Sequence, residues 1–215
     1  MKIGIMGGTF DPIHNGHLML GEMAYKQFDL DIVWFMPNGR PPHKAFTSIE
    51  SDVAKRAEMV TLAIEDCPYF TLQDYELNRQ EVSCSYETME HFNKVYPDVT
   101  FYFIIGADSL RNIEKWVHPE RLLKTCHVLA ACRDDWNTDQ AMLDRIAYLN
   151  KKYDAEIELL RAPLIDISSS ELREKIKAGE SIHGLIPVKV ERYIAKEGLY
   201  EPENSQNKKE TENGA

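Results

Sequence analysis

The sequence predicts an α/β fold in which helices cover both faces of a doubly wound parallel sheet. Short runs rich in Val, Ile and Phe recur along the chain, each with the length of a buried strand. Stretches with helical spacing of apolar residues separate these runs, and such alternation is typical of parallel sheets. The length of 215 residues suits one well-buried domain with a small elaboration.

The strands are predicted where apolar residues run together. The first covers residues 2–6 and leads into paired glycines, and four more follow at residues 31–36, 100–105, 127–132 and 156–160. Residues 70–77 are a further candidate, although their alternation is imperfect. Such sheets bind ligands at the carboxyl ends of their strands, so we expect the site in the loops that follow these strands.

Six helices are predicted from the spacing of apolar residues. They cover residues 16–28, 52–64, 85–95, 139–152, 170–178 and 188–196, and the last two form a small C-terminal helical part at about 168–200. Residues 1–200 are therefore expected to form one domain. Residues 201–215 are polar and lack large apolar side chains, so we expect a disordered tail.

Composition and charge exclude several classes of protein. No apolar run approaches the roughly 18 residues that span a bilayer, so a membrane span is excluded. The net charge of −10 argues against binding of long nucleic acids, which requires an extended basic surface. The first nine residues lack the features of a secretory signal, and we expect a cytoplasmic protein.

The four cysteines, Cys67, Cys84, Cys126 and Cys132, show no CxxC spacing. This pattern fits free thiols in a reducing compartment better than a disulfide framework. Cys126, His127 and Cys132 are conceivable metal ligands, but a buried strand is the stronger interpretation of that segment. No metal site made by the protein is predicted.

A glycine-rich segment, GGTFDPIHNGH at residues 7–17, lies between the first strand and the first helix. Glycines let a phosphate approach backbone N–H groups, and a helix N-terminus adds about half a positive charge, so the segment predicts an anion site. It contains neither the GK[ST] of a P-loop nor the GxGxxG of dinucleotide-binding folds.

Two histidines of this segment, His14 and His17, would share one face of the helix. Imidazole groups there can donate hydrogen bonds to phosphate oxygens and stabilise the charge of a transition state. One alternative is that they merely cap the helix. Another is a metal pair, although no third ligand follows at a suggestive spacing.

A second candidate segment, ISSSELR at residues 167–173, precedes the C-terminal helical pattern. Ser168 and Glu171 have the spacing of a capping box, which indicates a helix start. The serine hydroxyls and Arg173 would also form a cradle for a triphosphate, since a guanidinium can bind phosphate oxygens in bidentate fashion. The two interpretations are compatible.

Both segments resemble known motifs. GGTFDPIHNGHL resembles the HxGH motif of the nucleotidyltransferase superfamily, and ISSSELR resembles its ISSTxxR motif, with Ser170 in place of threonine. The resemblance implies a Rossmann-like nucleotidyltransferase fold. It also implies that His14 and His17 contact the phosphates of a nucleoside triphosphate, while the serines and Arg173 bind the leaving β- and γ-phosphates.

Further segments resemble the bacterial nicotinate-nucleotide adenylyltransferases. PNGRPPHK, ending at Lys44, resembles their PxxxPPHK loop, GADS at residues 106–109 resembles their turn, and Trp116 stands in a matching KW context. In that family the tryptophan stacks on the pyridine ring, and backbone N–H groups near an SYT element bind its carboxylate. Here the element reads SCS at residues 83–85, which leaves the preference for nicotinate over nicotinamide open.

The resemblance implies transfer of AMP from ATP to nicotinate mononucleotide in NAD biosynthesis, giving nicotinate adenine dinucleotide and pyrophosphate. The acceptor phosphate would attack the α-phosphorus directly, without a covalent enzyme intermediate. Mg²⁺ would bridge phosphate oxygens, with few protein ligands of its own. A phosphopantetheine enzyme is less well matched because those chains lack the PPHK loop, and a nucleotide-binding module without turnover is the alternative from another class.

The site residues implied by the resemblance form three groups. The catalytic residues are His14, His17 and Arg173. The ATP-binding residues are Gly7, Gly8, Thr9, Phe10, His14, His17, Gly106, Asp108, Ile167, Ser168, Ser169 and Arg173. The residues that bind nicotinate mononucleotide are Lys44, Ser85 and Trp116. The expected partners are these two small molecules; the oligomeric state is not predicted, and a homodimer is one alternative.

Overall fold

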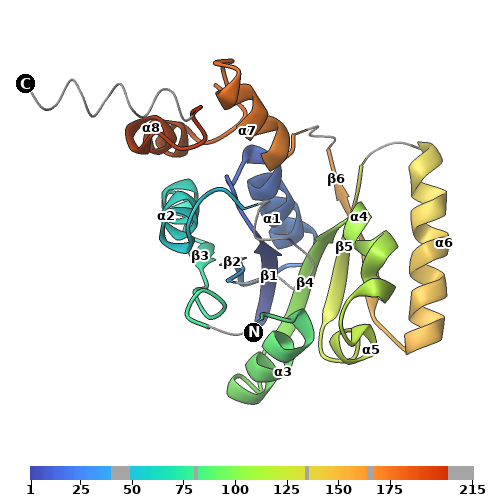
Figure 1. Cartoon of the computed structure of the whole chain (residues 1–215). Coiled ribbons are helices and arrows are strands. Elements are labelled where there is room, and N and C mark those ends of the chain that lie inside the picture. Colours follow the sequence, from blue (N-terminus) through green and yellow to red (C-terminus); the bar gives the residue numbers. More distant parts are fainter. Residues whose placement is uncertain (40–48, 80–81, 134–135, 164–166, 203–215) are drawn as a thin grey trace, which may run out of the picture.

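The computed structural model describes residues 1–39, 49–79, 82–133, 136–163 and 167–202, without the side chains of residues 132–139. In these residues six strands form one sheet in the order β3-β2-β1-β4-β5-β6 (Figure 1). Every neighbouring pair is parallel. The predicted parallel sheet is thus confirmed, whereas most of the predicted tail lies outside the described residues.

The strands are β1 (Lys2–Gly8), β2 (Ile32–Pro37), β3 (Phe70–Leu72), β4 (Thr100–Gly106), β5 (His127–Arg133) and β6 (Ile157–Ala162). The longer helices are α1 (Asn15–Gln27), α2 (Val53–Ile64), α3 (Ser85–Val95), α6 (Trp136–Tyr153), α7 (Ser169–Lys177) and α8 (Val188–Glu197). Three short helices follow β4, namely α4 (Ala107–Asn112), the 3₁₀ helix η2 (Ile113–Lys115) and α5 (Pro119–Leu122). None of the described helices is long and apolar enough to span a bilayer.

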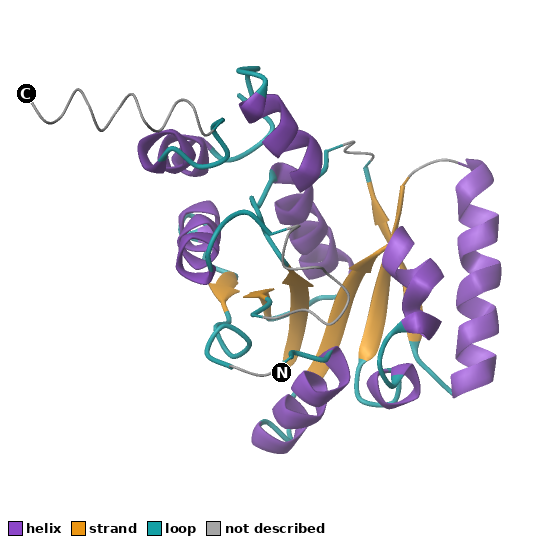
Figure 2. Ribbon diagram, viewed as in Figure 1, coloured by secondary structure: helices purple, strands orange, loops and turns teal. Residues whose placement is uncertain are grey.

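Successive strand residues pack into two separate clusters, one on each face of the sheet. The first cluster joins strand residues such as Met6 and Ile104 to buried residues of α1, α2, α7 and α8. The second joins their neighbours Ile5 and Phe103 to buried residues of α3, α4, α5 and α6. Because strand side chains alternate between faces, these clusters show helices on both sides of the sheet (Figure 2).

The centre of the sheet is the place where its strand order reverses. β1 pairs with β2 on one side and with β4 on the other. Helix α1, which follows β1, packs into the first cluster through Ala24, whereas α4, which follows β4, packs into the second through Leu110. Doubly wound sheets bind ligands in the crevice at such a reversal, so the ligand site is expected at the carboxyl ends of β1 and β4.

The structure differs from the predicted elements in three places. β3 ends at Leu72, five residues before the predicted end at Leu77, because the chain leaves the sheet and turns at residues 75–78. The helices α4, η2 and α5 were not predicted, since three to six residues are too few to show a helical period. Gly7 and Gly8 belong to β1 itself.

Candidate active site

The link from β1 to α1 holds the first predicted motif. Gly7 is exposed at the end of an otherwise buried strand, so its backbone is accessible at the crevice. Phe10 has a left-handed φ of 51° and is 1% exposed, and its ring folds back over Gly8. A Cβ on Gly8 would lie 2.9 Å from Cζ of Phe10, so a larger residue there would displace that ring.

The two histidines lie together at the start of α1. Their rings stack with centroids 3.7 Å apart. The backbone N–H of His14 donates to Nδ1 of His17 over 3.3 Å. Since Nδ1 accepts, the proton of a neutral His17 lies on Nε2, which is therefore a donor. His14 is the N-cap residue of α1, so the capping alternative is correct for its position and is compatible with phosphate binding.

The His14 ring is buried and uncharged. It is 6% exposed, and burial lowers the pKa of His14 from 6.5 to about 4. Its Nδ1 has no hydrogen-bond partner in the described residues. Buried polar atoms of folded proteins nearly always have a partner, so this nitrogen points to a ligand or water that completes it.

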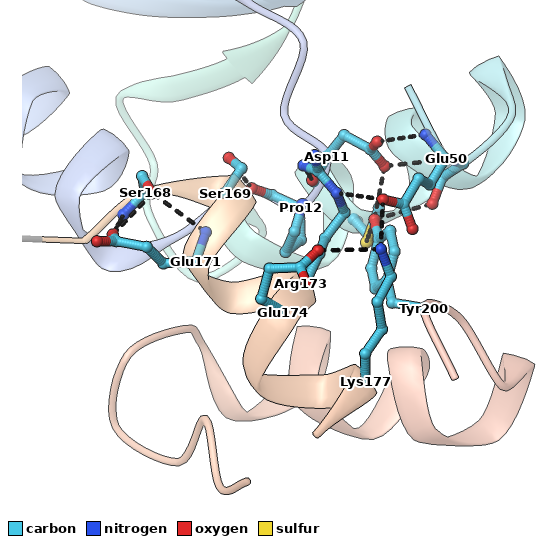
Figure 3. A network of polar contacts seen from close by, with 12 residues as sticks. Asp11, Pro12, Glu50, Ser168, Ser169, Glu171, Arg173, Glu174, Lys177 and Tyr200 are labelled. Atoms are coloured by element: carbon cyan, nitrogen blue, oxygen red, sulfur yellow. Dashed lines mark hydrogen bonds and ion pairs between the residues drawn. The ribbon is translucent and has the colours of Figure 1, made fainter. Parts of the chain in front are cut away.

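The second motif begins α7 beside the first. Ser168 is the N-cap residue, and its hydroxyl accepts from the N–H of Glu171 over 3.2 Å, as the capping-box spacing predicted. The hydroxyl of Ser169 donates to the carbonyl of Pro12 over 2.9 Å. The two segments, distant in the sequence, thus lie in direct contact (Figure 3).

Arg173 joins the second motif to the loop. Its Nη1 donates to the carbonyl of Asp11 over 2.8 Å, and its Nε donates to Glu50 over 3.0 Å (Figure 3). The side chain is 11% exposed. These are its acceptors in the described residues, so the remaining donors of the guanidinium are available to a ligand.

The site residues that were predicted outside these two motifs lie in or near helices α3, α4 and η2. Gly106 is the last residue of β4 and the N-cap of α4, and Asp108 lies exposed in the first turn of α4. Ser85 is the first residue of α3. Trp116 is half-buried, with its ring edge-to-face to Phe103 at 6.4 Å between centroids. Lys44 lies outside the described residues.

A cavity of about 380 Å³ lies between the loop after β3 and helix α3. It is lined by Gln73, Asp74, Tyr75, Asn78, Arg79, His91, Phe92 and Tyr96. None of the predicted site residues lines it. It is therefore distinct from the crevice at β1 and β4.

The comparisons with known proteins agree with this arrangement. The family described as Cytidylyltransferase-like matches residues 5–175. A protein of Lachnoclostridium phytofermentans, named a probable nicotinate-nucleotide adenylyltransferase, is 46% identical over 199 residues, covering 93% of this chain and 98% of the relative. This chain belongs to the nicotinate-nucleotide adenylyltransferases. It is thus a nucleotidyltransferase, as the sequence predicted.

Other members of the family show the same extent of similarity. A relative from Clostridium tetani with the same name is 42% identical and covers 93% of this chain and 98% of its own length. The Plasmodium falciparum nicotinic acid mononucleotide adenylyltransferase, solved in complex with NaAD, has a TM-score of 0.75 at 24% identity, over 93% of this chain and 97% of that one. The predicted Rossmann-like nucleotidyltransferase fold is confirmed.

Three residues that the sequence did not single out hold the loop of this family member. Arg56 is 1% exposed and donates to the carbonyls of Thr9 and Asn38, each over 2.8 Å. Asp11 and Tyr200 meet in a buried hydrogen bond of 2.6 Å. The sequence does carry a signal for Arg56, which is a lone cation on the apolar side of a predicted helix. Asp11 lies within the first motif, although it was not assigned a role there. No sequence signal pointed to Tyr200.

Neither metal-site alternative gains support. In the described residues no group of three or more His, Cys, Asp or Glu could hold a metal ion. His127 stacks on Tyr102 and lies 2.8 Å from a carboxylate oxygen of Glu156, in β5 as predicted. The side chain of Cys132 is outside the described part.

Proposed function

We propose that this chain transfers AMP from ATP to nicotinate mononucleotide and releases pyrophosphate, as a step of NAD biosynthesis. The observation that carries the proposal is the meeting of the two phosphate-type motifs at the central crevice, through Ser169 and Arg173. The acceptor follows from family membership, which rests on 46% identity over nearly the whole chain. The NaAD complex of the Plasmodium falciparum protein supports the same chemistry.

On the ATP side, the chain supplies hydrogen-bond donors. Nε2 of His17 carries a proton that can bind an α-phosphate oxygen, and the buried Nδ1 of His14 lacks a partner in the described residues. Two helix N-termini, those of α1 and α7, add positive potential at the same edge. The remaining donors of Arg173 would bind the leaving pyrophosphate and stabilise the charge that develops on it.

On the acceptor side, the proposal assigns Trp116 to the pyridine ring, the backbone at Ser85 to its carboxylate, and Lys44 to its phosphate. A phosphate monoester is largely a dianion at neutral pH, because its second pKa is about 6. It needs no strong base to attack the α-phosphorus. The enzyme therefore acts by holding the two phosphates in line and by stabilising charge.

Magnesium is proposed to enter with ATP. The carboxylate of Asp11, which lies in the loop itself, accepts hydrogen bonds from Glu50, Ser51 and Tyr200. A carboxylate so occupied is a poor metal ligand, which favours an ion held by phosphate oxygens and water. Mg²⁺ would neutralise charge on the phosphates. Location in the cytoplasm also stays part of this proposal.

One experiment tests the proposed function. Purified protein is mixed with ATP, Mg²⁺ and, in parallel, nicotinate mononucleotide, nicotinamide mononucleotide or phosphopantetheine. Pyrophosphate release and the adenylylated product are measured, with Arg173→Ala as the control for contaminating activity. We expect product chiefly with nicotinate mononucleotide and little from the variant. Product chiefly with another acceptor would overturn the substrate, and binding of ATP without product would favour a nucleotide-binding module.

A further inference from the structure

A buried carboxylate lies beneath the phosphate loop. Asp11 is 1% exposed. Its Oδ2 accepts from the backbone N–H of Glu50 over 2.8 Å, and its Oδ1 accepts from the backbone N–H of Ser51 over 3.2 Å. A third donor, the hydroxyl of Tyr200, reaches Oδ1 over 2.6 Å. The side chain is thus held from two directions, by the segment before α2 and by the C-terminal end of the described chain.

The surroundings of Tyr200 make its hydroxyl a hydrogen-bond donor to Asp11. It is 6% exposed, and its oxygen also accepts from the hydroxyl of Ser51 over 2.8 Å. Burial and the neighbouring charge of Asp11 raise the pKa of Tyr200 well above its ordinary value of 10. The phenol therefore keeps its proton at every pH at which the protein would work. A hydrogen bond from a neutral phenol to a buried carboxylate is of the strong, charge-assisted class.

The backbone of the same residue carries the active-site contacts. The carbonyl of Asp11 accepts from Arg173, and the carbonyl of the next residue, Pro12, accepts from Ser169 (Figure 3). His14 follows two positions later. Any movement of Asp11 would move the anchor of Arg173 and the start of α1 together. The side-chain contacts of Asp11 are therefore linked through the chain itself to both predicted phosphate motifs.

Charged groups of both signs surround Asp11. Arg56, which binds the loop carbonyl of Thr9, interacts favourably with the charge of Asp11. Arg173 binds the backbone of Asp11, and Glu50 is in turn paired with Arg173 and Lys177 at 3.0 Å each. Opposite charges thus alternate across this cluster, which stabilises a buried carboxylate that would otherwise be costly.

We propose that Asp11 and Tyr200 are a positioning pair for adenylyl transfer, in which the Tyr200 hydroxyl fixes the loop that presents both phosphate motifs to ATP. Neither residue touches the substrate, and the pair acts through the loop. The inference rests on the proposed function. It distinguishes the pair from an ordinary stabilising contact, which would support folding without affecting the reaction.

The test compares Tyr200→Phe with Tyr193→Phe. Both changes remove one phenol oxygen near the C-terminal end, but Tyr193 has no hydrogen bond through its side chain in the described residues and packs beside the core. We expect kcat/KM for ATP to fall by about 10-fold in Tyr200→Phe, which corresponds to one hydrogen bond to a charged group. KM for nicotinate mononucleotide should stay within about 2-fold, and Tyr193→Phe should match the parent in both constants.

A double-mutant cycle with Asp11→Asn tests whether the two residues act together. If the amide variant folds, adding Tyr200→Phe to it should cause little further loss of kcat/KM, because the shared contact is already broken. Additive losses would overturn the pair. If the amide variant does not fold, the value of kcat/KM for ATP in Tyr200→Phe alone tests the proposed pair.

The outcomes separate this inference from the proposed function. Parent protein that forms no dinucleotide with any acceptor would refute the function. An active parent whose Tyr200→Phe variant loses thermal stability but keeps kcat/KM for ATP would refute the positioning pair alone. Equal losses for ATP and for nicotinate mononucleotide would also refute it, since the pair is assigned to the ATP side.

Discussion

The hydroxyl of Ser169 lies 2.9 Å from the carbonyl oxygen of Pro12, although 157 positions separate the two residues in the sequence. This contact makes one unit of two motifs that the sequence places near opposite ends of the chain. It also places the N-terminus of α7 next to that of α1.

The first prediction concerns His17→Ala. We expect turnover to fall by about 10²-fold or more, the range for loss of one preorganised donor to a developing charge. The matched control is His183→Ala, because His183 is exposed and pairs with Glu191. Steady-state kinetics measure both variants, and circular dichroism checks that they are folded. Nearly normal turnover in a folded His17→Ala protein would show that the imidazole has no role in the reaction.

The second prediction concerns Trp116→Ala. The ring lies edge-to-face to that of Phe103 in β4. We expect a rise in KM for nicotinate mononucleotide equivalent to about 1 to 3 kcal/mol, the usual value of base stacking on an aromatic side chain. KM for ATP should change far less. An equal rise for both substrates would mean that the tryptophan serves only the structure.

The third prediction concerns the pH dependence of stability that His14 causes. Its pKa is about 4 in the folded protein and near 6.5 when unfolded, so the unfolded chain binds the additional proton between these values. Stability therefore falls as the pH drops through this window. We expect a loss of about 2 kcal/mol in the free energy of unfolding between about pH 7 and pH 5.

Urea unfolding of the parent and of His14→Gln checks this value. The variant lacks the titrating group, so its free energy of unfolding should change less over the same pH range. Parallel curves for the two proteins would argue against a buried, uncharged His14.

The fourth prediction concerns Glu50. Burial alone would raise its pKa, but the hydrogen bonds from Lys177 and Arg173 outweigh burial and lower it below 4.5. The stability that this carboxylate contributes is thus present above about pH 4.5 and lost as the pH falls through its lowered pKa. Melting temperatures of the parent and Glu50→Gln should differ at about pH 6 and converge as the pH falls below the lowered pKa of Glu50. A difference in melting temperature that stays constant over this pH range would contradict the ion pairs of Glu50. The control is Glu174→Gln, because Glu174 is a more exposed partner of Lys177.

The sheet could be predicted well because buried strands have a strong sequence signal. The five strands predicted from apolar runs all begin within one residue of the observed strands, which are β1, β2, β4, β5 and β6. The length of the edge strand β3 was overestimated. Its residues Phe70 to Leu72 pair only with β2, and an edge strand has weaker constraints on its pattern.

The positions of His14, His17, Ser168 and Arg173 at one edge could also be predicted, because they follow strands or begin helices whose ends meet in such folds. The contacts that hold them could not. Tyr200 reaches Asp11 across 189 positions, and no local pattern encodes so distant a hydrogen bond. The ion pair between Arg173 and Glu50 likewise depends on tertiary structure.

The hydrogen bond from Tyr200 to Asp11 has a consequence for synthesis of the protein. Chains emerge from the ribosome with the N-terminus first, at about 5 to 20 residues per second. The first phosphate loop is therefore made long before Arg173 and Tyr200, and it waits without its anchors while most of the sheet is translated. Nascent chains that end before Tyr200 would hold an unformed nucleotide pocket, so adenylyl transfer would begin only after Tyr200 has been translated.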